Sequence, residues 1–212
     1  MSLTFYRAPM STASVTDRVI AELGVPHEKV TFDLKKGDSR RPEFLALNPN
    51  GRVPTVVHDG VAIFESSAIT MYLGEAFGVE KGLWPAAGPR RGDAMKWVAW
   101  SNVTFGEAIG RWMSNTKDWV PVEERNARVA ERALGDVERC LGILDKELEG
   151  RPYLRGAEFS LVDAHVGSFI DWLGFSGFDV ARWRRVADWV KRCNDRPAYH
   201  AVSAANAPPA KR

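Results

Sequence analysis

Hydrophobic and polar positions alternate over short stretches near the start of the chain. The apolar residues at positions 30, 32 and 34 occupy every second place between Glu28 and Leu34, which predicts a strand, and residues 3–6 form another β-prone run. Between them, apolar residues recur at helical spacing from Val15 to Leu23, and Gly24 and Pro26 end this helix. The order strand, helix, strand predicts a parallel pair joined by a right-handed crossover.

A second pair of strands follows a polar, turn-rich stretch at residues 35–42 and a short helical turn at residues 43–47, which ends before Pro49. Asp59 and Gly60 separate two short β-branched runs, the pattern of a hairpin. Glu65, with the two serines after it, then starts a helix. Residues 1–80 are therefore predicted to form a small α/β domain.

The pattern changes after a stretch rich in glycine and proline, and we place the domain linker at residues 81–89. Residues 90–212 are predicted to form an all-helical domain. One long helical segment is expected at residues 95–112 and another from Pro121, with an apolar stripe of helical period. Ser160 and Asp163 form a capping box before a helix over residues 161–173, another helix lies between 180 and 194, and the tail from Ala204 is expected to be loose.

Composition narrows the functional class. The chain has 212 residues, of which 45% are hydrophobic and 26% charged, an ordinary globular composition. Its 29 basic and 27 acidic residues are interspersed, which argues against nucleic acid or an anionic membrane as the main partner. The sequence shows neither a signal-peptide pattern nor the roughly 18 apolar residues of a membrane helix, and its two cysteines fit a reducing compartment, so we expect a cytoplasmic protein.

Candidate chemistry is concentrated between Asn48 and Ile69. Pro54 stands at the mouth of a strand, where an edge or a cis bond exposes the backbone of Val53. Glu65 and Ser66 place a carboxylate and a hydroxyl beside the unpaired N–H groups of a helix start. Such a site suits a small zwitterion, whose carboxylate would meet the helix start, its ammonium Glu65, and its peptide edge Val53.

The motif Asn48-Pro49-x-Gly51-x-Val53-Pro54, followed by Glu65-Ser66-Ser67-Ala68-Ile69 and by the later Ser160-x-x-Asp163, resembles the cytosolic glutathione transferase family, in a bacterial, phi-, zeta- or beta-like form. The resemblance covers nearly the whole chain. It implies a thioredoxin-like domain followed by a helical bundle, with glutathione as co-substrate, no metal, and a homodimer.

Residue roles follow from this resemblance. It implies a cis Val53-Pro54 bond, with the Val53 backbone paired to the cysteinyl part of glutathione, and a γ-glutamyl end held by Glu65 and Ser66. It also places Arg40 near the glycyl carboxylate. Arg52 is a candidate for the tripeptide backbone or a carboxylate, and Trp112 is a candidate for the electrophile pocket, although aromatic residues at helical spacing more often belong to the core.

The thiol-activating residue of the family lies in the loop after the first strand, where this chain has hydroxyls instead of a cysteine. Ser11 is the first candidate, followed by Thr12 and Ser14, and Tyr6 on the strand is a weaker one. Ser11 can equally cap the first helix. A hydroxyl that donates to the sulfur, reinforced by the helix dipole, lowers a thiol pKa of about 8.5 toward neutrality. The four histidines show neither ligand nor triad spacing.

The predicted function is therefore conjugation of glutathione to small hydrophobic electrophiles, as in detoxification. A glutathione-dependent isomerase or dehalogenase is a second possibility, because the same thiolate can add and then leave. A non-catalytic module that binds glutathione or docks a partner is the third.

Overall fold

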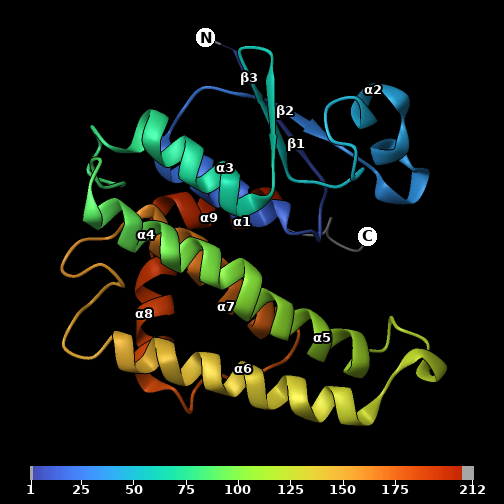
Figure 1. The fold of residues 1–212 in the computed structure, drawn as a ribbon, viewed down its shortest axis with the longest axis vertical. Helices are drawn as coiled ribbons and strands as arrows, with labels where there is room; N and C mark the ends of the chain where they lie inside the picture. The colour runs from blue at the N-terminus through green and yellow to red at the C-terminus, as the bar shows by residue number, and fades with distance from the viewer. Residues whose placement is uncertain (1, 207–212) are drawn as a thin grey trace. The chain divides into compact units, whose positions relative to one another are not determined.

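The computed structural model describes residues 2–206 (Figure 1). Two compact units can be separated. One combines the residues up to Arg91 with those from Asp195 onward, and the other spans Gly92–Asn194. The α/β class of the first part and the helical class of the second are as the sequence predicts.

The first unit is built on a four-stranded sheet in the order β2-β1-β3-β4. Its strands are β1 (Leu3–Arg7), β2 (Glu28–Thr31), β3 (Thr55–His58) and β4 (Val61–Phe64). β1 and β2 are parallel, whereas β3 is antiparallel to both β1 and β4. The predicted parallel pair and the hairpin at Asp59-Gly60 are therefore both confirmed.

Helices contact both faces of this sheet. The α-helices of the unit are α1 (Ala13–Leu23), α2 (Pro42–Leu45), α3 (Ser66–Leu73) and α9 (Pro197–Asn206). The buried Arg7 of β1 forms an ion pair with Asp17 of α1 at 2.7 Å. On the other face, the ring of Tyr6 packs against Phe44 of α2 at 5.4 Å between centroids. Alternate residues of β1 thus face α1 and α2, as the period of a strand requires.

Helix α9 packs against α1. The guanidinium of Arg196 meets the carboxylate of Glu22 with N–O distances of 2.8 to 3.0 Å, and this Glu22 side chain is almost fully buried. The guanidinium of Arg18 lies 4.8 Å from the ring centre of Tyr199, a cation–π contact. Two charged contacts thus attach the last described helix to the first one.

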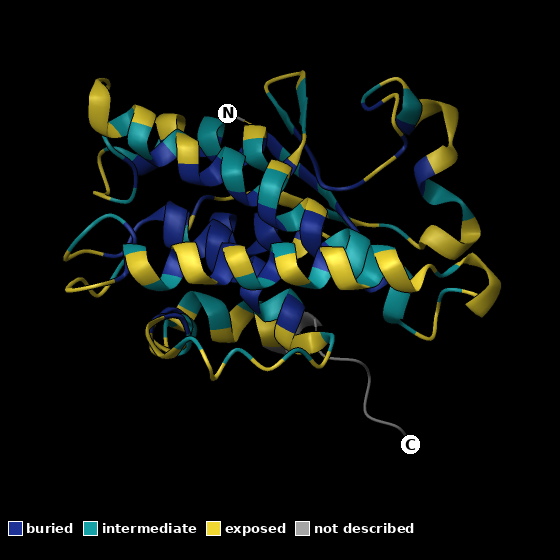
Figure 2. Cartoon of the chain, turned by 60° about the horizontal axis from the view of Figure 1, so that its bottom comes forward, coloured by how far each residue is buried: buried dark blue, intermediate teal, exposed yellow. Residues whose placement is uncertain are grey.

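The second unit is helical. Its α-helices are α4 (Pro89–Trp100), whose first turn still belongs to the first unit, α5 (Glu107–Thr116), α6 (Ala127–Glu147), α7 (Leu161–Phe175) and α8 (Arg184–Asn194). Every residue from 161 to 170 of α7 is buried, so α7 is the core helix of this unit. α6 instead has one buried and one exposed side, as its apolar stripe predicts (Figure 2).

The capping box at the start of α7 is confirmed. The backbone N–H and the hydroxyl of Ser160 both donate to the Asp163 carboxylate, which also accepts from the Leu154 N–H and the indole N–H of Trp189. Burial raises the pKa of Asp163, and these four hydrogen bonds oppose that shift. The carboxylate therefore joins three segments of the unit.

Several predicted boundaries differ from the structure. The second strand ends at Thr31 rather than Leu34, because Asp33 caps a 3-10 helix (Leu34–Lys36) through the N–H of Lys35. The segment predicted as one helix over 95–112 contains a π-helical stretch (Ser101–Gly106) between α4 and α5. The helix expected from Pro121 begins at Ala127, where the Asn126 side chain accepts from the N–H groups of residues 128 and 129.

The last helix, α9, is not predicted from the sequence. α9 runs to Asn206, past the Ala204 at which a loose tail is expected, and the rest of that tail lies outside the described residues. Between residues 2 and 206, no helix has the length and apolar character needed to cross a membrane.

Candidate functional site

Strand register brings three predicted segments to one end of the sheet. Thr55 of β3 pairs with Tyr6 of β1 on one side and with Phe64 of β4 on the other. The loop after β1, the Val53-Pro54 bend and the start of α3 at Glu65 therefore all lie next to this row of paired residues. This end of the sheet is the candidate site, and all of it belongs to the first unit.

Asn48 organises the bend. Its buried side chain donates to the backbone oxygen of Arg52 at 2.8 Å and to the hydroxyl of Thr55 at 3.0 Å, and its oxygen accepts from the N–H of Asn50 at 3.0 Å. One side chain thus ties the residues before and after Val53. The role of Asn48 was not predicted, although an asparagine before a proline in a loop that needs backbone partners is a signal for such a turn.

Val53 presents an open backbone edge. The Val53-Pro54 peptide bond is cis, as the family resemblance implies. Within residues 2–206, the N–H of Val53 has no hydrogen-bond partner, and its oxygen accepts only a long bond of 3.4 Å from the hydroxyl of Thr12. A buried backbone donor normally has a partner, so this edge suits an extended peptide ligand.

The three candidate hydroxyls differ in their surroundings. Ser11 donates to the Ala8 oxygen at 2.7 Å and accepts from the N–H of Ala13 at 3.3 Å, so its hydroxyl supports the turn that leads into α1. Thr12 is exposed, and its hydroxyl faces the oxygen of Val53. Ser14 is exposed on the first turn of α1. Of the three, the structure places Thr12 beside the bend.

Glu65 has an unusual backbone. Its φ of 67° is rare for a residue with a side chain, and it is the N-cap residue of α3 without capping the helix through its side chain. Among the described residues, its exposed carboxylate has no hydrogen bond or ion pair. Ser66 follows as the buried first residue of the helix. Strain of this kind costs of the order of 1–3 kcal/mol and is found mostly at functional sites.

The two candidate arginines flank the bend. The Arg40 Nη1 atom lies 3.4 Å from the Asn50 oxygen, and it is also 2.8 Å from where a Cβ on Gly51 would stand. Gly51 has a φ of 59° and lets the bend approach Arg40 and Ser39 closely. Arg52 is exposed, and no described residue pairs with its guanidinium.

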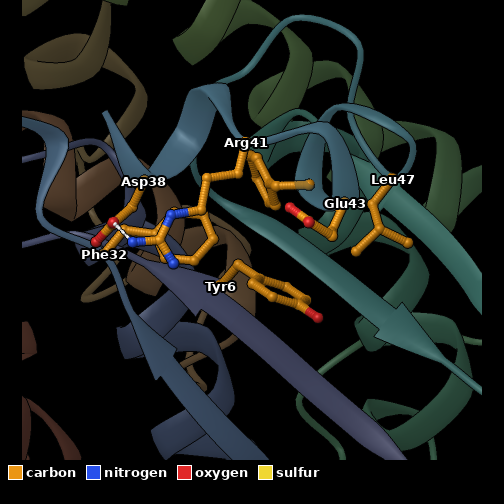
Figure 3. Close-up of a pocket in the computed structure, with 7 residues that line it drawn as sticks. Tyr6, Phe32, Asp38, Arg41, Glu43 and Leu47 are labelled. Atoms are coloured by element: carbon orange, nitrogen blue, oxygen red, sulfur yellow. Dashed lines mark ion pairs between the residues drawn. The ribbon is translucent and has the colours of Figure 1, made fainter. Parts of the chain in front are cut away.

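Two other candidates have aromatic surroundings. The ring of Tyr6 turns to the α2 face, where it packs against Phe32 as well as Phe44 (Figure 3). Trp112 belongs to the second unit, where Lys117 lies 4.3 Å from its ring centre and Phe178 packs against it edge-on. Trp112 is therefore part of a local aromatic cluster.

The remaining titratable groups offer little nucleophilic chemistry. Neither Cys140 nor Cys193 forms a disulfide, both are buried in the second unit, and burial raises the pKa of the Cys140 thiol. Burial also lowers the pKa of His165 to about 3, so this histidine is neutral in the fold. No group of three or more histidine, cysteine, aspartate or glutamate side chains within the described range is arranged to hold a metal ion.

Comparison with known proteins identifies the family. The model of the glutathione S-transferase N-terminal domain matches residues 1–75, and that of the C-terminal domain matches residues 97–197. The chain belongs to the glutathione S-transferase family. It is 31% identical to glutathione S-transferase GstB of Escherichia coli K12 over 186 residues, which cover 86% of this chain and 88% of that protein.

Other members of the family extend the comparison. The disulfide-bond oxidoreductase YfcG of Escherichia coli K12 is 28% identical over 204 residues, 92% of each chain. Among solved structures, the glutathione transferase URE2P6 of Phanerochaete chrysosporium, in complex with oxidized glutathione, has a TM-score of 0.88 at 21% identity and shares the fold over 97% of this chain and 96% of its own. A glutathione transferase of Burkholderia graminis with two glutathione molecules per subunit has a TM-score of 0.85 at 26% identity, over 100% and 90% of the two chains.

Proposed function

We propose that this member of the family is a glutathione transferase that binds glutathione at the end of the sheet described above, lowers the pKa of its thiol and conjugates it to small hydrophobic electrophiles. The observation that carries the proposal is the position of the Thr12 hydroxyl beside the open backbone edge of Val53. A thiol held on that edge would lie within reach of a hydroxyl donor.

The binding roles use groups that the fold leaves available. The N–H and oxygen of Val53 would pair with the backbone of the cysteinyl residue, as an added strand pairs with a sheet edge. The carboxylate of Glu65 would hold the γ-glutamyl ammonium, and the N-terminus of α3 at Ser66 would hold its carboxylate. Arg40 and Arg52 are the cations available for the glycyl carboxylate.

Thr12 is proposed as the hydroxyl that donates to the sulfur. The Ser11 proton is already engaged by the Ala8 oxygen at 2.7 Å, whereas the Thr12 hydroxyl gives up only a 3.4 Å contact when it turns to a thiolate. A hydrogen bond to a charged group contributes about 1.5–3 kcal/mol, enough to lower a thiol pKa by about one to two units. Ser11 then has a supporting role in shaping the loop, and Ser14 remains the third candidate.

The chemistry is nucleophilic substitution or addition. Bound glutathione supplies the sulfur nucleophile. With an aryl halide, a sulfur–carbon bond forms, the carbon–halogen bond breaks, halide leaves, and the thiol proton passes to solvent. The protein contributes orientation and stabilisation of the thiolate, and the hydroxyl acts as a donor rather than as a nucleophile.

The test compares the conjugation rates of three variants with 1-chloro-2,4-dinitrobenzene. Thr12→Val keeps the shape of the side chain but removes its hydroxyl, and we expect kcat/KM to fall at least about tenfold. Ser14→Ala removes the hydroxyl of the third candidate and should retain near wild-type turnover if Thr12 has the role. Undiminished turnover of Thr12→Val, together with loss of turnover in Ser11→Ala, would transfer the role to Ser11. Retention on glutathione resin without any turnover by the wild type would contradict the enzymatic proposal.

Disulfide reduction is a second candidate, because a related protein is a disulfide-bond oxidoreductase and a similar structure holds two glutathione molecules per subunit. Both cysteines of this chain are buried in its second unit, so the two thiols that such a reaction consumes would both come from glutathione. Two glutathione thiols would reduce one substrate disulfide to two thiols and form one glutathione disulfide. Measurement of glutathione disulfide formed with hydroxyethyl disulfide distinguishes this reaction from conjugation.

We also propose that the helical unit supplies the electrophile pocket, with Trp112 as a candidate lining residue.

We further propose that the protein works as a homodimer in the cytoplasm, as the family likeness implies. Sedimentation equilibrium measures the mass of the assembly. A mass equal to one chain at working concentration would contradict it.

A further inference from the structure

The α2 face of the sheet carries a hollow of about 260 Å³ (Figure 3). Three aromatic rings line it, contributed by Tyr6 of β1, Phe32 just after β2, and Phe44 of α2. Their centroids are 4.7 to 5.6 Å apart, and Phe32 meets Phe44 edge-on. The rings therefore form one connected aromatic wall.

This wall is only partly covered. Phe44 is buried, whereas Tyr6 and Phe32 keep part of their surface accessible. The Tyr6 hydroxyl has no hydrogen-bond partner among the described residues. A molecule in the hollow can therefore contact the π faces of the rings and the phenolic hydroxyl of Tyr6.

The charges around the rings are not balanced. Arg41 forms an ion pair with Asp38 at 2.5 Å, and the other oxygen of Asp38 accepts from the N–H of Asp33 at 2.8 Å. The third charged group is Glu43, whose exposed carboxylate has no ion pair or hydrogen bond within residues 2–206. In Figure 3 this carboxylate lies on the same side of the hollow as Leu47, away from Asp38. One negative charge therefore stays unpaired beside the aromatic wall.

We propose that this hollow binds a small organic cation, an ammonium group that carries an aromatic or alkyl portion. Aromatic faces attract cations, and a nearby carboxylate adds to that attraction. An organic anion would meet the unpaired Glu43 carboxylate, and a neutral ligand would gain from neither effect. The hollow is smaller than the roughly 300 Å³ at which drug-sized pockets begin, so the ligand is small.

The site is distinct from the proposed glutathione site. None of the residues assigned to glutathione lines the hollow. The neighbouring arginines illustrate the separation, because Arg40 reaches the oxygen of Asn50 while Arg41 turns to Asp38. The proposal therefore does not depend on glutathione binding or on catalysis.

The first experiment is an NMR titration of the full chain with benzyltrimethylammonium. We expect saturable shifts of the ring resonances of Tyr6, Phe32 and Phe44. Phenylacetate, an anion of similar size, should produce at least about fivefold weaker binding. Absence of saturation, saturation without any effect on these rings, or equal affinity for phenylacetate would each overturn the proposal.

The second experiment removes the unpaired charge. Glu43→Gln keeps the size of an exposed side chain and should weaken binding of benzyltrimethylammonium about fivefold, whereas the matched control Glu80→Gln, also exposed, should bind as the wild type does. Equal affinities of the two variants would contradict the role of Glu43. Glutathione affinity should be unchanged in Glu43→Gln, so failure here is distinguishable from failure of the proposed function.

Discussion

The hydroxyl of Thr12 lies 3.4 Å from the backbone oxygen of Val53, although 41 positions separate the two residues in the chain. This contact links the loop after β1 to the cis bend before β3. Ser11, its neighbour, instead bonds within its own loop, to Ala8 and Ala13. The two adjacent hydroxyls therefore contact different parts of the fold.

Thr12 should control the ionisation of the bound thiol. In Thr12→Val, the pKa of glutathione bound to the protein should rise by about one unit or more, because the donor to the thiolate is lost. Thr12→Ser restores a hydroxyl and should restore most of the shift. Ultraviolet absorbance of the thiolate as a function of pH measures this pKa. The same pKa in the wild type and Thr12→Val would rule out the assignment.

Glu65 should show opposite effects on stability and affinity. Glu65→Gly relieves a φ of 67° and should raise the free energy of unfolding by about 1 kcal/mol, while it removes the carboxylate proposed for the γ-glutamyl ammonium. Glu65→Gln keeps the Cβ and serves as the control that loses only the charge. Urea unfolding and calorimetric titration with glutathione measure the two quantities. Unchanged glutathione affinity in both variants would contradict the binding role.

Gly51 should be needed for the shape of the bend. A Cβ at this position would stand 2.9 Å from the Ser39 oxygen and 2.8 Å from Arg40 Nη1, so Gly51→Ala should weaken glutathione binding and cost about 1–3 kcal/mol of stability. Gly60→Ala is the matched control, since Gly60 also has a positive φ, of 85°, but no atom within 4 Å of its added Cβ. Gly60→Ala should lose stability and keep its affinity. Equal glutathione affinities in the two variants would show that crowding at Gly51 is unimportant.

Asp163 should be essential to the stability of the helical unit. Asp163→Asn replaces an acceptor of four hydrogen bonds with an amide whose NH₂ group faces two of the same donors, and we expect a loss of about 3 kcal/mol. Asp188→Asn, an exposed site on α8, should change stability by less than about 0.5 kcal/mol. Chemical unfolding of both variants provides the comparison, and similar values for the two would refute this account.

His165 should make stability depend on pH. Its pKa is about 3 in the fold against 6.5 as the ordinary value, so between these limits the unfolded chain binds a proton that the folded chain does not. Stability should therefore rise with pH through this window and fall as the pH drops from 6.5. The free energy of unfolding of His165→Gln should vary less between pH 4.5 and 6.5 than that of the wild type or of the exposed-site control His27→Gln. Parallel curves for all three would exclude His165 as the cause.

Local patterns predicted much of the fold. Alternation and turn residues located β1, β3 and β4, and the capping box located the start of α7, because in each case the signal lies within a few residues of the feature that it specifies. The end of β2 was harder to predict, since Phe32 and Leu34 continue the alternation although Asp33 already caps the next turn. The π-helical stretch inside the predicted long helix has no comparable signal in the sequence.

The candidate site could be predicted only to the level of its segments. The Val-Pro and Glu-Ser motifs locate the bend and the helix start, but the order of preference among Ser11, Thr12 and Ser14 depends on which hydroxyl faces Val53. That orientation is set by the path of the loop and by Asn48, whose hydrogen bonds span the bend. Such contacts depend on three-dimensional packing between distant residues. They do not produce a periodic pattern in the sequence from which they could be predicted.

The attachment of α9 to α1 has a consequence for how the protein is made. The segment from Asp195 that completes the first unit is translated only after all of Gly92–Asn194, so the thioredoxin-like unit lacks α9 for as long as the helical unit is being synthesised. During this interval the Glu22 carboxylate, which is nearly buried in the folded protein, lacks its ion-pair partner Arg196. The half of the molecule that is synthesised first therefore cannot complete its fold until the other half has been synthesised.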